Sequence, residues 1–288
     1  RRPGRSVLTI GLVAASSFTI VAISAFRLSE TRSGTGGFAV VAESSQPIYF
    51  DFGTPEGRAE LGFSSNDDEA LDGCDSYALR VLPGDDASCL NLYRPAHPRV
   101  LGVPPAMMSR GGFEWGSSAA KTPEQIANPW LLLYEKLPSG AIPVALDQNT
   151  ANYSLQLWKG VGERFDIDDG CGGKLTLEIV GLLKNSFFQG DLLIGEGAFL
   201  KHFPETTGHR FYLIDVPPNG KASDSEKRRA ESISPAPVPP ADPRRTEAVV
   251  RALEHSLGDY GLGAQRAEGG LAGFLAGQNT YLSTFQSL

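Results

Sequence analysis

Three aspartates that precede a glycine are the first candidates for chemistry in this chain, because they resemble the start of a calcium-binding loop. They are Asp166, Asp168 and Asp169, followed by Gly170. In an EF-hand loop the glycine stands at position 6, whereas here it stands fifth, and Leu177 occupies position 12, where a bidentate Glu is required. We therefore interpret these residues as an acidic β-turn.

The histidines and the glycine-rich segments match no catalytic or metal-binding pattern. The sequence has no His-Glu-x-x-His motif, no Cys/His ligand spacing, no phosphate-binding P-loop and no Gly-x-Ser-x-Gly elbow. We therefore expect no enzyme activity, no cofactor and no metal site. The four histidines are His97, His202, His209 and His255.

The cysteines offer a candidate disulfide between Cys74 and Cys89. These two residues are fifteen positions apart and flank a predicted strand at 77–82. Outside the cytoplasm such a bridge would add about 3 kcal/mol of stability. Cys171 would then be left over. A Cys89–Cys171 bridge and three free thiols are the alternatives, because sequence does not determine connectivity.

The composition excludes several classes of protein. The 26 Lys and Arg residues against 33 Asp and Glu residues give a net charge of −7. Nucleic acid is therefore not the expected partner, because phosphate binding needs a basic surface. A hydrophobic content of 41% excludes a wholly disordered chain. The 33 glycines and 20 prolines predict many turns and at least one linker.

An uncharged stretch near the start predicts a transmembrane helix over residues 6–26. Its 21 residues would span roughly 30 Å, the thickness of the hydrocarbon core of a bilayer. A signal peptide and a buried core helix are the alternatives, and both are usually shorter. The rest of the chain would then lie outside the cytoplasm. Because the chain begins with Arg1 and its last apolar stretch, 279–288, has no helix stop signal, we expect a piece of a longer protein.

The periodicity of the remaining chain predicts an α+β fold rather than a parallel α/β sheet. An acidic turn is expected at 65–69, an extended loop around Pro95–Pro105, and a flexible Pro-rich loop at 217–243. The expected strands are 38–50, 77–82, 142–146, 175–183, 191–194, 211–216 and 260–266, and the expected helices are 57–63, 195–202 and 246–257.

Three segments carry a resemblance to a known family. They are residues 84–95 (GDDASCLNLYRP), 179–183 (IVGLL) and 278–286 (QNTYLSTFQ). Together with the predicted membrane helix and the exterior α+β domain, they resemble FtsX-like (MacB-type) ABC transporter permeases. The resemblance implies a MacB-like periplasmic domain of two subdomains over 33–288. One subdomain would be inserted at about 141–216, and a stalk helix at 268–288 would lead toward a second membrane span.

The resemblance also implies a function in the bacterial inner (plasma) membrane. A cytoplasmic ABC ATPase subunit would hydrolyse ATP, and the extracytoplasmic domain would move in response (mechanotransmission). Such a permease exports lipoproteins, peptides or small molecules. The expected partners are a second copy or a paired permease, and a periplasmic adaptor or lipoprotein.

Two other functions compete with the permease. The first alternative is a singly membrane-anchored binding or sensor domain outside the cytoplasm. An anchored hydrolase ranks last, because no nucleophile and base occur in a recognisable pattern.

Overall fold

Alternating apolar residues form the strands of the structure, a computed structural model that describes residues 34–84, 97–169, 173–217 and 241–269. These residues belong to one unit, Thr31–Leu271. The strands are β1 (Val40–Ile48), β2 (Asp75–Leu82), β3 (Arg99–Val103), β4 (Trp115–Ser118), β5 (Ile142–Asp147), β6 (Arg164–Asp168), β7 (Lys174–Leu183), β8 (Asp191–Gly195), β9 (His209–Asp215) and β10 (Leu262–Arg266).

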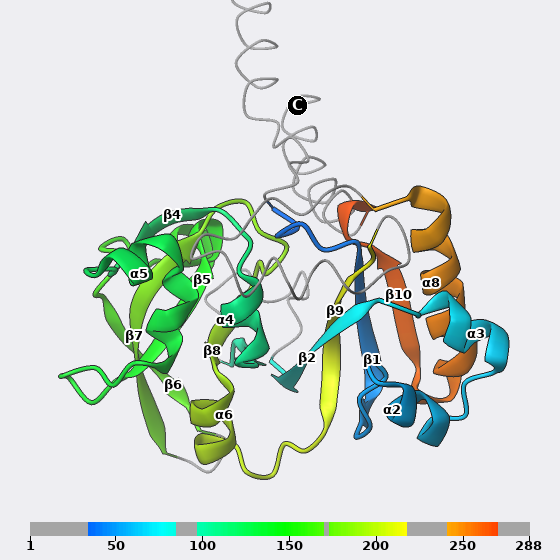
Figure 1. Cartoon of the computed structure of the whole chain (residues 1–288). Coiled ribbons are helices and arrows are strands. Elements are labelled where there is room, and N and C mark those ends of the chain that lie inside the picture. The colour runs from blue at the N-terminus through cyan, green and yellow to red at the C-terminus, as the bar shows by residue number, and fades with distance from the viewer. Residues whose placement is uncertain (1–33, 85–96, 170–172, 218–240, 270–288) are drawn as a thin grey trace, which may run out of the picture. The chain divides into compact units, whose positions relative to one another are not determined.

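Short helices connect and cover the strands (Figure 1). The α-helices are α2 (Pro55–Glu60), α3 (Ser65–Ala70), α4 (Ala106–Arg110), α5 (Pro123–Ala127), α6 (Glu196–His202) and α8 (Pro243–Ser256). The described residues also form two 3-10 helices, η1 (Pro129–Tyr134) and η3 (Gly258–Tyr260), and one π-helix, η2 (Thr150–Ser154).

The strands form one ten-stranded sheet with the order β10-β1-β9-β2-β3-β8-β5-β7-β4, and β6 also pairs with β7. We call β10, β1, β9 and β2, with α2, α3 and α8, the first lobe. The second lobe comprises β3 to β8 and helices α4 to α6 (Figure 1). The strand pairs β3–β8 and β5–β7 are parallel, and the other pairs are antiparallel.

Strand β2 joins the two lobes by changing its partner. Its first part, residues 75–79, pairs with β9 in the first lobe, and residues 80–82 pair with β3 in the second. The hydrogen bonding of the sheet therefore continues from one lobe into the other.

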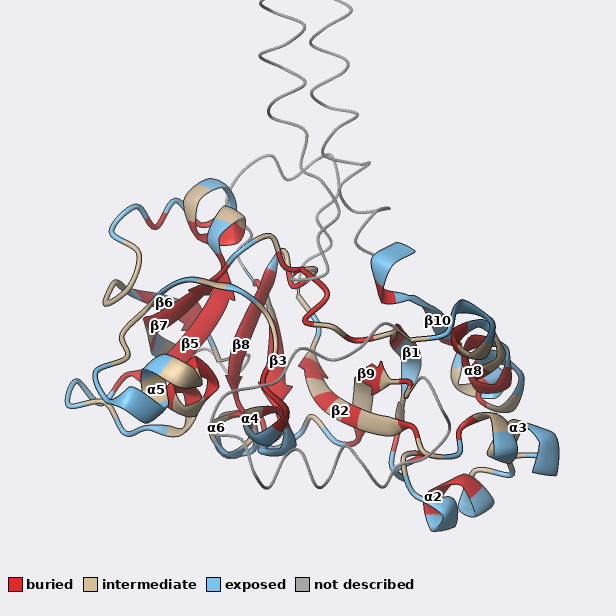
Figure 2. Cartoon of the chain, turned by 45° about the horizontal axis from the view of Figure 1, so that its top comes forward, coloured by how far each residue is buried: buried red, intermediate tan, exposed pale blue. Residues whose placement is uncertain are grey.

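Three apolar clusters form the core. One lies between α8 and the first-lobe strands, where Val249 and Leu253 of α8 are fully buried. A second lies within the second lobe, around Ile179 and Leu192. The third contains residues of both lobes, such as Leu79 and Leu193. Figure 2 shows the resulting burial of β5, β7 and β8.

The two ends of this unit lie side by side. The amide of Ala267, which follows β10, donates to the carbonyl of Ala39, which precedes β1, over 2.9 Å. The amide of Ala39 in turn donates to Ile214 of β9 over 3.1 Å. The chain therefore enters and leaves the first lobe at one place, at the end of β1 opposite to Ile48 (Figure 1).

The predicted α+β class is confirmed, and each strand and helix expected within the described ranges corresponds to an element of the structure. Two expectations are wrong. The expected acidic turn at 65–69 is helix α3, because the Ser64 side chain caps the amide of Asp67. The region expected as an extended loop contains β3, which pairs in parallel with β8.

The expected acidic β-turn is also placed differently. Asp166 and Asp168 lie in strand β6, and the amide of Asp169 donates to the Gly173 carbonyl over 3.1 Å at the end of the β6–β7 pair.

Several predictions fall outside the described ranges. Within those ranges no helix combines the length and the apolar character that a bilayer crossing needs. The predicted membrane helix at 6–26 lies outside them, as do most of the Pro-rich loop and all of the stalk helix beyond Gly269. An inserted subdomain at about 141–216 stays a prediction. In the sheet, β5 to β8 lie in the second lobe, whereas β9 pairs with β1 and β2.

Candidate functional site

Three arginines lie where the two lobes meet, and each binds a carboxylate far away in the sequence. They are Arg80 of β2, Arg99 of β3 and Arg110 at the end of α4. Their carboxylate partners are Glu196, Asp191 with Glu43, and Asp215. Every one of these three contact sets includes residues of both lobes. The junction is therefore the best-defined cluster of charged groups in the part of the chain that the structure describes.

Arg99 holds a buried carboxylate of its own lobe and an exposed one of the first lobe. Its Nε and Nη2 donate to the two carboxylate oxygens of Asp191 over 2.6 and 2.9 Å, and its Nη1 donates to Glu43 over 2.9 Å. Burial raises the pKa of Asp191, and Arg99 opposes that shift. The two-pronged contact places a counter-charge against the Asp191 carboxylate, in a side chain that is only 3% exposed.

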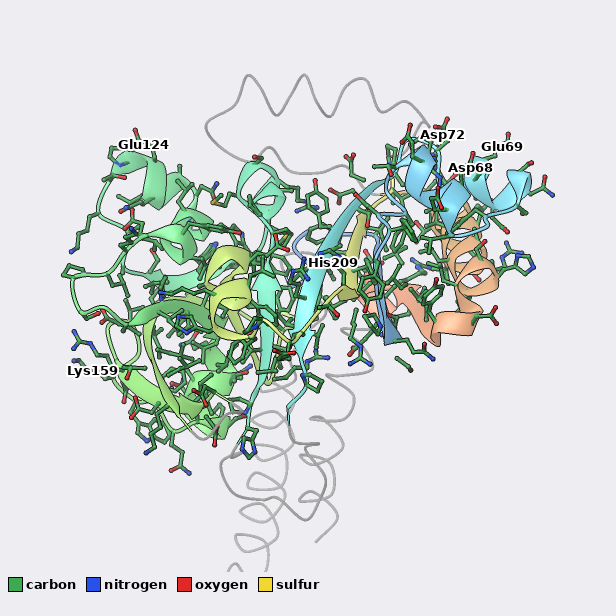
Figure 3. All side chains as sticks on the ribbon, turned by 90° about the horizontal axis from the view of Figure 1, so that it is seen from below. Asp68, Glu69, Asp72, Glu124, Lys159 and His209 are labelled. Carbon is green, nitrogen blue, oxygen red and sulfur yellow. The ribbon has the colours of Figure 1, made fainter. Side chains whose placement is uncertain are left out.

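Arg80 connects β2 to the N-terminal turn of α6. Its Nε donates to Glu196 over 3.0 Å, and its Nη1 donates to the Gly208 carbonyl over 3.2 Å. His209, at the start of β9, places its Nε2 atom 3.6 Å from the same carboxylate, too far for a hydrogen bond but close enough for an ionic contact. His209 and Arg80 both lower the pKa of Glu196. Figure 3 shows His209 between the two lobes.

Arg110 connects α4 to the end of β9 and to the segment before β1. Its Nε and Nη2 donate to the two carboxylate oxygens of Asp215 over 2.9 and 2.7 Å. The guanidinium carbon also lies 3.7 Å from the ring centre of Phe38, which is a cation–π contact. The Arg110 side chain is only 3% exposed, so these partners replace the water that would otherwise solvate its charge.

The lobes share an apolar core beside the arginines. Tyr77 and Phe211 of the first lobe belong to the same buried cluster as Leu101, Phe188 and Leu193 of the second lobe. The rings of Phe188 and Phe211 lie 6.0 Å apart. Domains that share a large apolar interface do not move independently. The shared core, the continuous sheet and the arginine contacts therefore make the two lobes one mechanical body.

A metal-binding cluster and a serine hydrogen-bonded to a histidine are two arrangements that are typical of catalytic sites. The described residues contain no group of three His, Cys, Asp or Glu side chains that could hold a metal ion. His255 does contact Asp67 over 2.8 Å, and the Ser256 hydroxyl donates to the same carboxylate oxygen over 3.0 Å. Both contacts end on the carboxylate, so no serine is hydrogen-bonded to a histidine base there.

The candidate disulfide residues are only partly described. Cys74 is buried between the first-lobe strands and α8, and burial raises the pKa of its thiol to about 11. Cys89 and Cys171 lie outside the described ranges. The Cys74–Cys89 pairing therefore stays a prediction.

The three arginines stand in no motif that points to them in the sequence. Their carboxylate partners lie 56 to 116 residues away, so no local spacing could reveal the pairs. One sequence signal does exist, a repeated Gly-Gly-Phe tripeptide at 36–38 and 111–113. The second copy follows Arg110 directly, and the first ends with the Phe38 ring that Arg110 contacts.

Comparison with known proteins gives structural neighbours only. No family model matches the sequence, and no curated protein matches it. The periplasmic region of MacB from Actinobacillus actinomycetemcomitans aligns at 11% identity with a TM-score of 0.33 over 83% of this chain and 93% of that chain. The extracellular domain of the noncanonic ABC-type transporter YknZ from Gram-positive bacteria aligns at 10% identity with a TM-score of 0.30 over 78% and 99%.

The structural neighbours are thus periplasmic and extracellular domains of ABC-type transporters, as the sequence resemblance predicted. TM-scores as low as these do not justify assigning the function of the neighbours to this chain. The geometry of the chain itself has to support any functional assignment.

Proposed function

We propose that this chain is the extracytoplasmic domain, with its leading membrane helix, of an ABC transporter permease in the bacterial inner membrane. A cytoplasmic ATPase subunit would supply the energy, and the chain itself would have no enzymatic activity. The domain would move as one body and act on a lipoprotein, a peptide or a small molecule outside the cytoplasm. A second copy or paired permease, and an adaptor or lipoprotein, would complete the assembly.

The observation that carries this proposal is the adjacency of the two ends of the domain. Ala39 and Ala267 are joined by a backbone hydrogen bond of 2.9 Å, so the chain leaves the domain where it entered. A domain inserted between two membrane segments needs such a return. A sensor domain with a single anchor, the competing proposal, has no such requirement.

The rigidity of the domain also supports a mechanical role. A displacement applied at the two adjacent ends reaches the second lobe through the sheet at β2–β3 and through the shared core. Internal bending would absorb such a displacement, and the arginine contacts at the junction oppose bending.

The adjacency of Ala39 and Ala267 also provides the test. Deleting residues 40–266 joins two positions that are already hydrogen-bonded, so the flanking segments need not move apart. We would express the full-length protein and this deletion variant in bacterial membranes. We would then measure co-purification of an ABC ATPase and ATP-dependent release of substrate on the outer side.

A permease should bind the ATPase in both forms and lose substrate handling only in the deletion variant. The gene beyond the codon for Leu288 should then encode further apolar spans. A protein that binds no ABC ATPase and has no further span would be the singly anchored sensor, and the proposal would be wrong.

A further inference from the structure

The segment that leads into β1 forms hydrogen bonds with the second lobe, although the Phe38 ring also packs against Tyr77 of β2, with the ring centres 5.5 Å apart. We call residues 34–38 the incoming segment. The carbonyl of Gly34 accepts a hydrogen bond from the amide of Phe187 over 3.2 Å, and the carbonyl of Gly36 accepts one from Nη1 of Arg110. Phe187 follows β7 and Arg110 ends α4, so both donors belong to the second lobe.

The two Gly-Gly-Phe tripeptides pack against each other. Gly36 has a φ of 61°, and a Cβ atom there would lie 2.6 Å from ring carbon Cδ2 of Phe113. The Phe38 and Phe113 ring centres are 6.0 Å apart. Gly112 has a φ of 94°, and a Cβ atom there would overlap the Gly36 carbonyl oxygen. Both turns therefore need glycine to approach this closely.

Phe113 holds its ring between the incoming segment and the second-lobe core. Its φ of 68° is unusual for a residue with a side chain, so the packing around it has to offset the backbone strain. The ring centre lies 5.8 Å from that of Trp130 and 5.2 Å from that of Phe188. The ring is thus anchored in the second lobe while it contacts Gly36 and Phe38.

Arg110 joins these groups electrostatically. One guanidinium binds the Gly36 carbonyl, lies over the Phe38 ring, and forms a two-pronged ion pair with Asp215 at the end of β9. The incoming segment, the first lobe and the second lobe therefore meet at a single buried side chain.

We infer that the paired Gly-Gly-Phe turns with Arg110, which we call the turn clamp, transmit movement of the incoming segment directly to the second lobe. Apart from the Phe187–Gly34 hydrogen bond and the packing of Phe38 in the shared core, such movement would otherwise reach that lobe through β1, β9 and β2. The role of the clamp in transport rests on the proposed function. The mechanical connection itself does not.

Hydrogen exchange of the full chain tests the connection. Replacing Arg110 by Gln (Arg110→Gln) removes the charge and the two-pronged contact. The amides of Phe38 and Phe187 donate to the carbonyls of Thr35 and Gly34 in the incoming segment. We expect both amides to exchange about ten-fold faster or more, because loss of the Arg110 hydrogen bonds to Gly36 and Asp215 loosens that segment. Arg80→Gln is the matched control, because Arg80 also connects the lobes but does not contact the incoming segment. It should leave both amides within about two-fold of the wild-type rate.

Two outcomes would overturn the inference. One is unchanged exchange at Phe38 and Phe187 in Arg110→Gln, and the other is equal acceleration by Arg80→Gln. If Arg110→Gln does not fold, Arg110→Lys takes its place, because it keeps the charge but not the two-pronged geometry. It should accelerate exchange at the same two amides relative to wild type, by less than the roughly ten-fold change expected for Arg110→Gln.

Transport assays separate this inference from the proposed function. If the protein is a permease, Arg110→Gln should lower substrate release per ATP hydrolysed more than Arg80→Gln does. If no ABC ATPase binds while the exchange result holds, the proposed function fails and the clamp stands. If the ATPase binds but the exchange result fails, the clamp is wrong and the permease stands.

Discussion

Arg99 and Asp191 show how the junction depends on matched charges. Asp191 is almost fully buried, and removal of Arg99 would leave its carboxylate without a counter-charge. Removing one partner of a buried ion pair costs far more than removing both, because the remaining charge is desolvated and unpaired. The contribution of the arginine is therefore best measured against that of its partner.

We predict that Arg99→Met lowers the free energy of unfolding of the chain by about 3 kcal/mol. The double variant Arg99→Met/Asp191→Leu should recover most of that loss, because no buried charge remains. Denaturant unfolding of wild type, both single variants and the double variant gives the coupling energy. Equal losses in Arg99→Met and in the double variant would show that the loss does not come from an unpaired Asp191.

Glu196 should make the stability of the chain depend on pH in the acid range. Its pKa lies below the usual 4.5, chiefly because of His209, with Arg80 adding to the effect. A carboxyl group with a lowered pKa in the folded state binds fewer protons there than in the unfolded state. It therefore stabilises the fold above pH 4.5 and loses that contribution as the pH falls through its folded-state pKa.

We expect Glu196→Gln to flatten the acid limb of a plot of unfolding free energy against pH, below about pH 4.5. His209→Gln removes only the largest cause of the shift and should give an intermediate slope. Thermal unfolding measured from pH 3 to pH 7 would test this, and a wild-type slope in Glu196→Gln would contradict it.

At the scale of the elements, glycines with positive φ set how closely turns approach. Gly36 and Gly140 have similar φ values, 61° and 72°, but different surroundings. An added Cβ atom at Gly36 meets the Phe113 ring, whereas at Gly140 nothing lies within 4 Å. Substitutions at these two glycines therefore separate two contributions to the loss of stability: the strain of a left-handed backbone, which both share, and the steric overlap, which occurs only at Gly36.

We predict that Gly140→Ala costs about 1 kcal/mol, the price of a left-handed backbone alone. Gly36→Ala should cost about 2 to 4 kcal/mol, because the Phe113 ring also has to move. Urea unfolding of the two variants measures the difference. Equal losses would mean that the two turns are not held in close contact in solution.

The elements that sequence analysis predicts are those with a clear local pattern. β2 alternates along its length, β7 begins with alternating apolar residues, and α8 places Val249, Val250 and Leu253 on one face. β3 is not predicted, because prolines surround its five residues and its parallel partner β8 lies about 90 residues away. α3 is hidden by its acidic composition, and only the Ser64 cap indicates it.

The candidate site is harder to predict from the sequence, because its contacts also join residues that are far apart in the chain. A carboxylate such as Asp215 or Glu196 becomes a partner of an arginine only after the strands have assembled. The repeated Gly-Gly-Phe tripeptide is a local pattern, but its meaning depends on the contact between the two copies. Long-range pairing, rather than residue type, defines this junction.

At the scale of the whole unit, the question is whether the two lobes unfold together. The shared core contains residues of both lobes, and the sheet is continuous through β2. Separating the lobes would therefore expose buried rings such as Phe188 and Phe211, at a cost of about 1.5–3 kcal/mol for each ring. A partly unfolded state with one intact lobe should not accumulate.

The distribution of tryptophan makes this prediction testable without any mutation. The three tryptophans of the chain, Trp115, Trp130 and Trp158, all lie in the second lobe, whereas α8, with 14 residues, lies in the first. Tryptophan fluorescence therefore reports the second lobe, and hydrogen exchange of the α8 amides reports the first. We expect both to follow one denaturant transition with the same midpoint, because a cooperative unit unfolds as a whole. Exchange of the α8 amides at denaturant concentrations where the fluorescence is still native would show that the lobes are separate units, and a rigid transmission of movement between them would then be excluded.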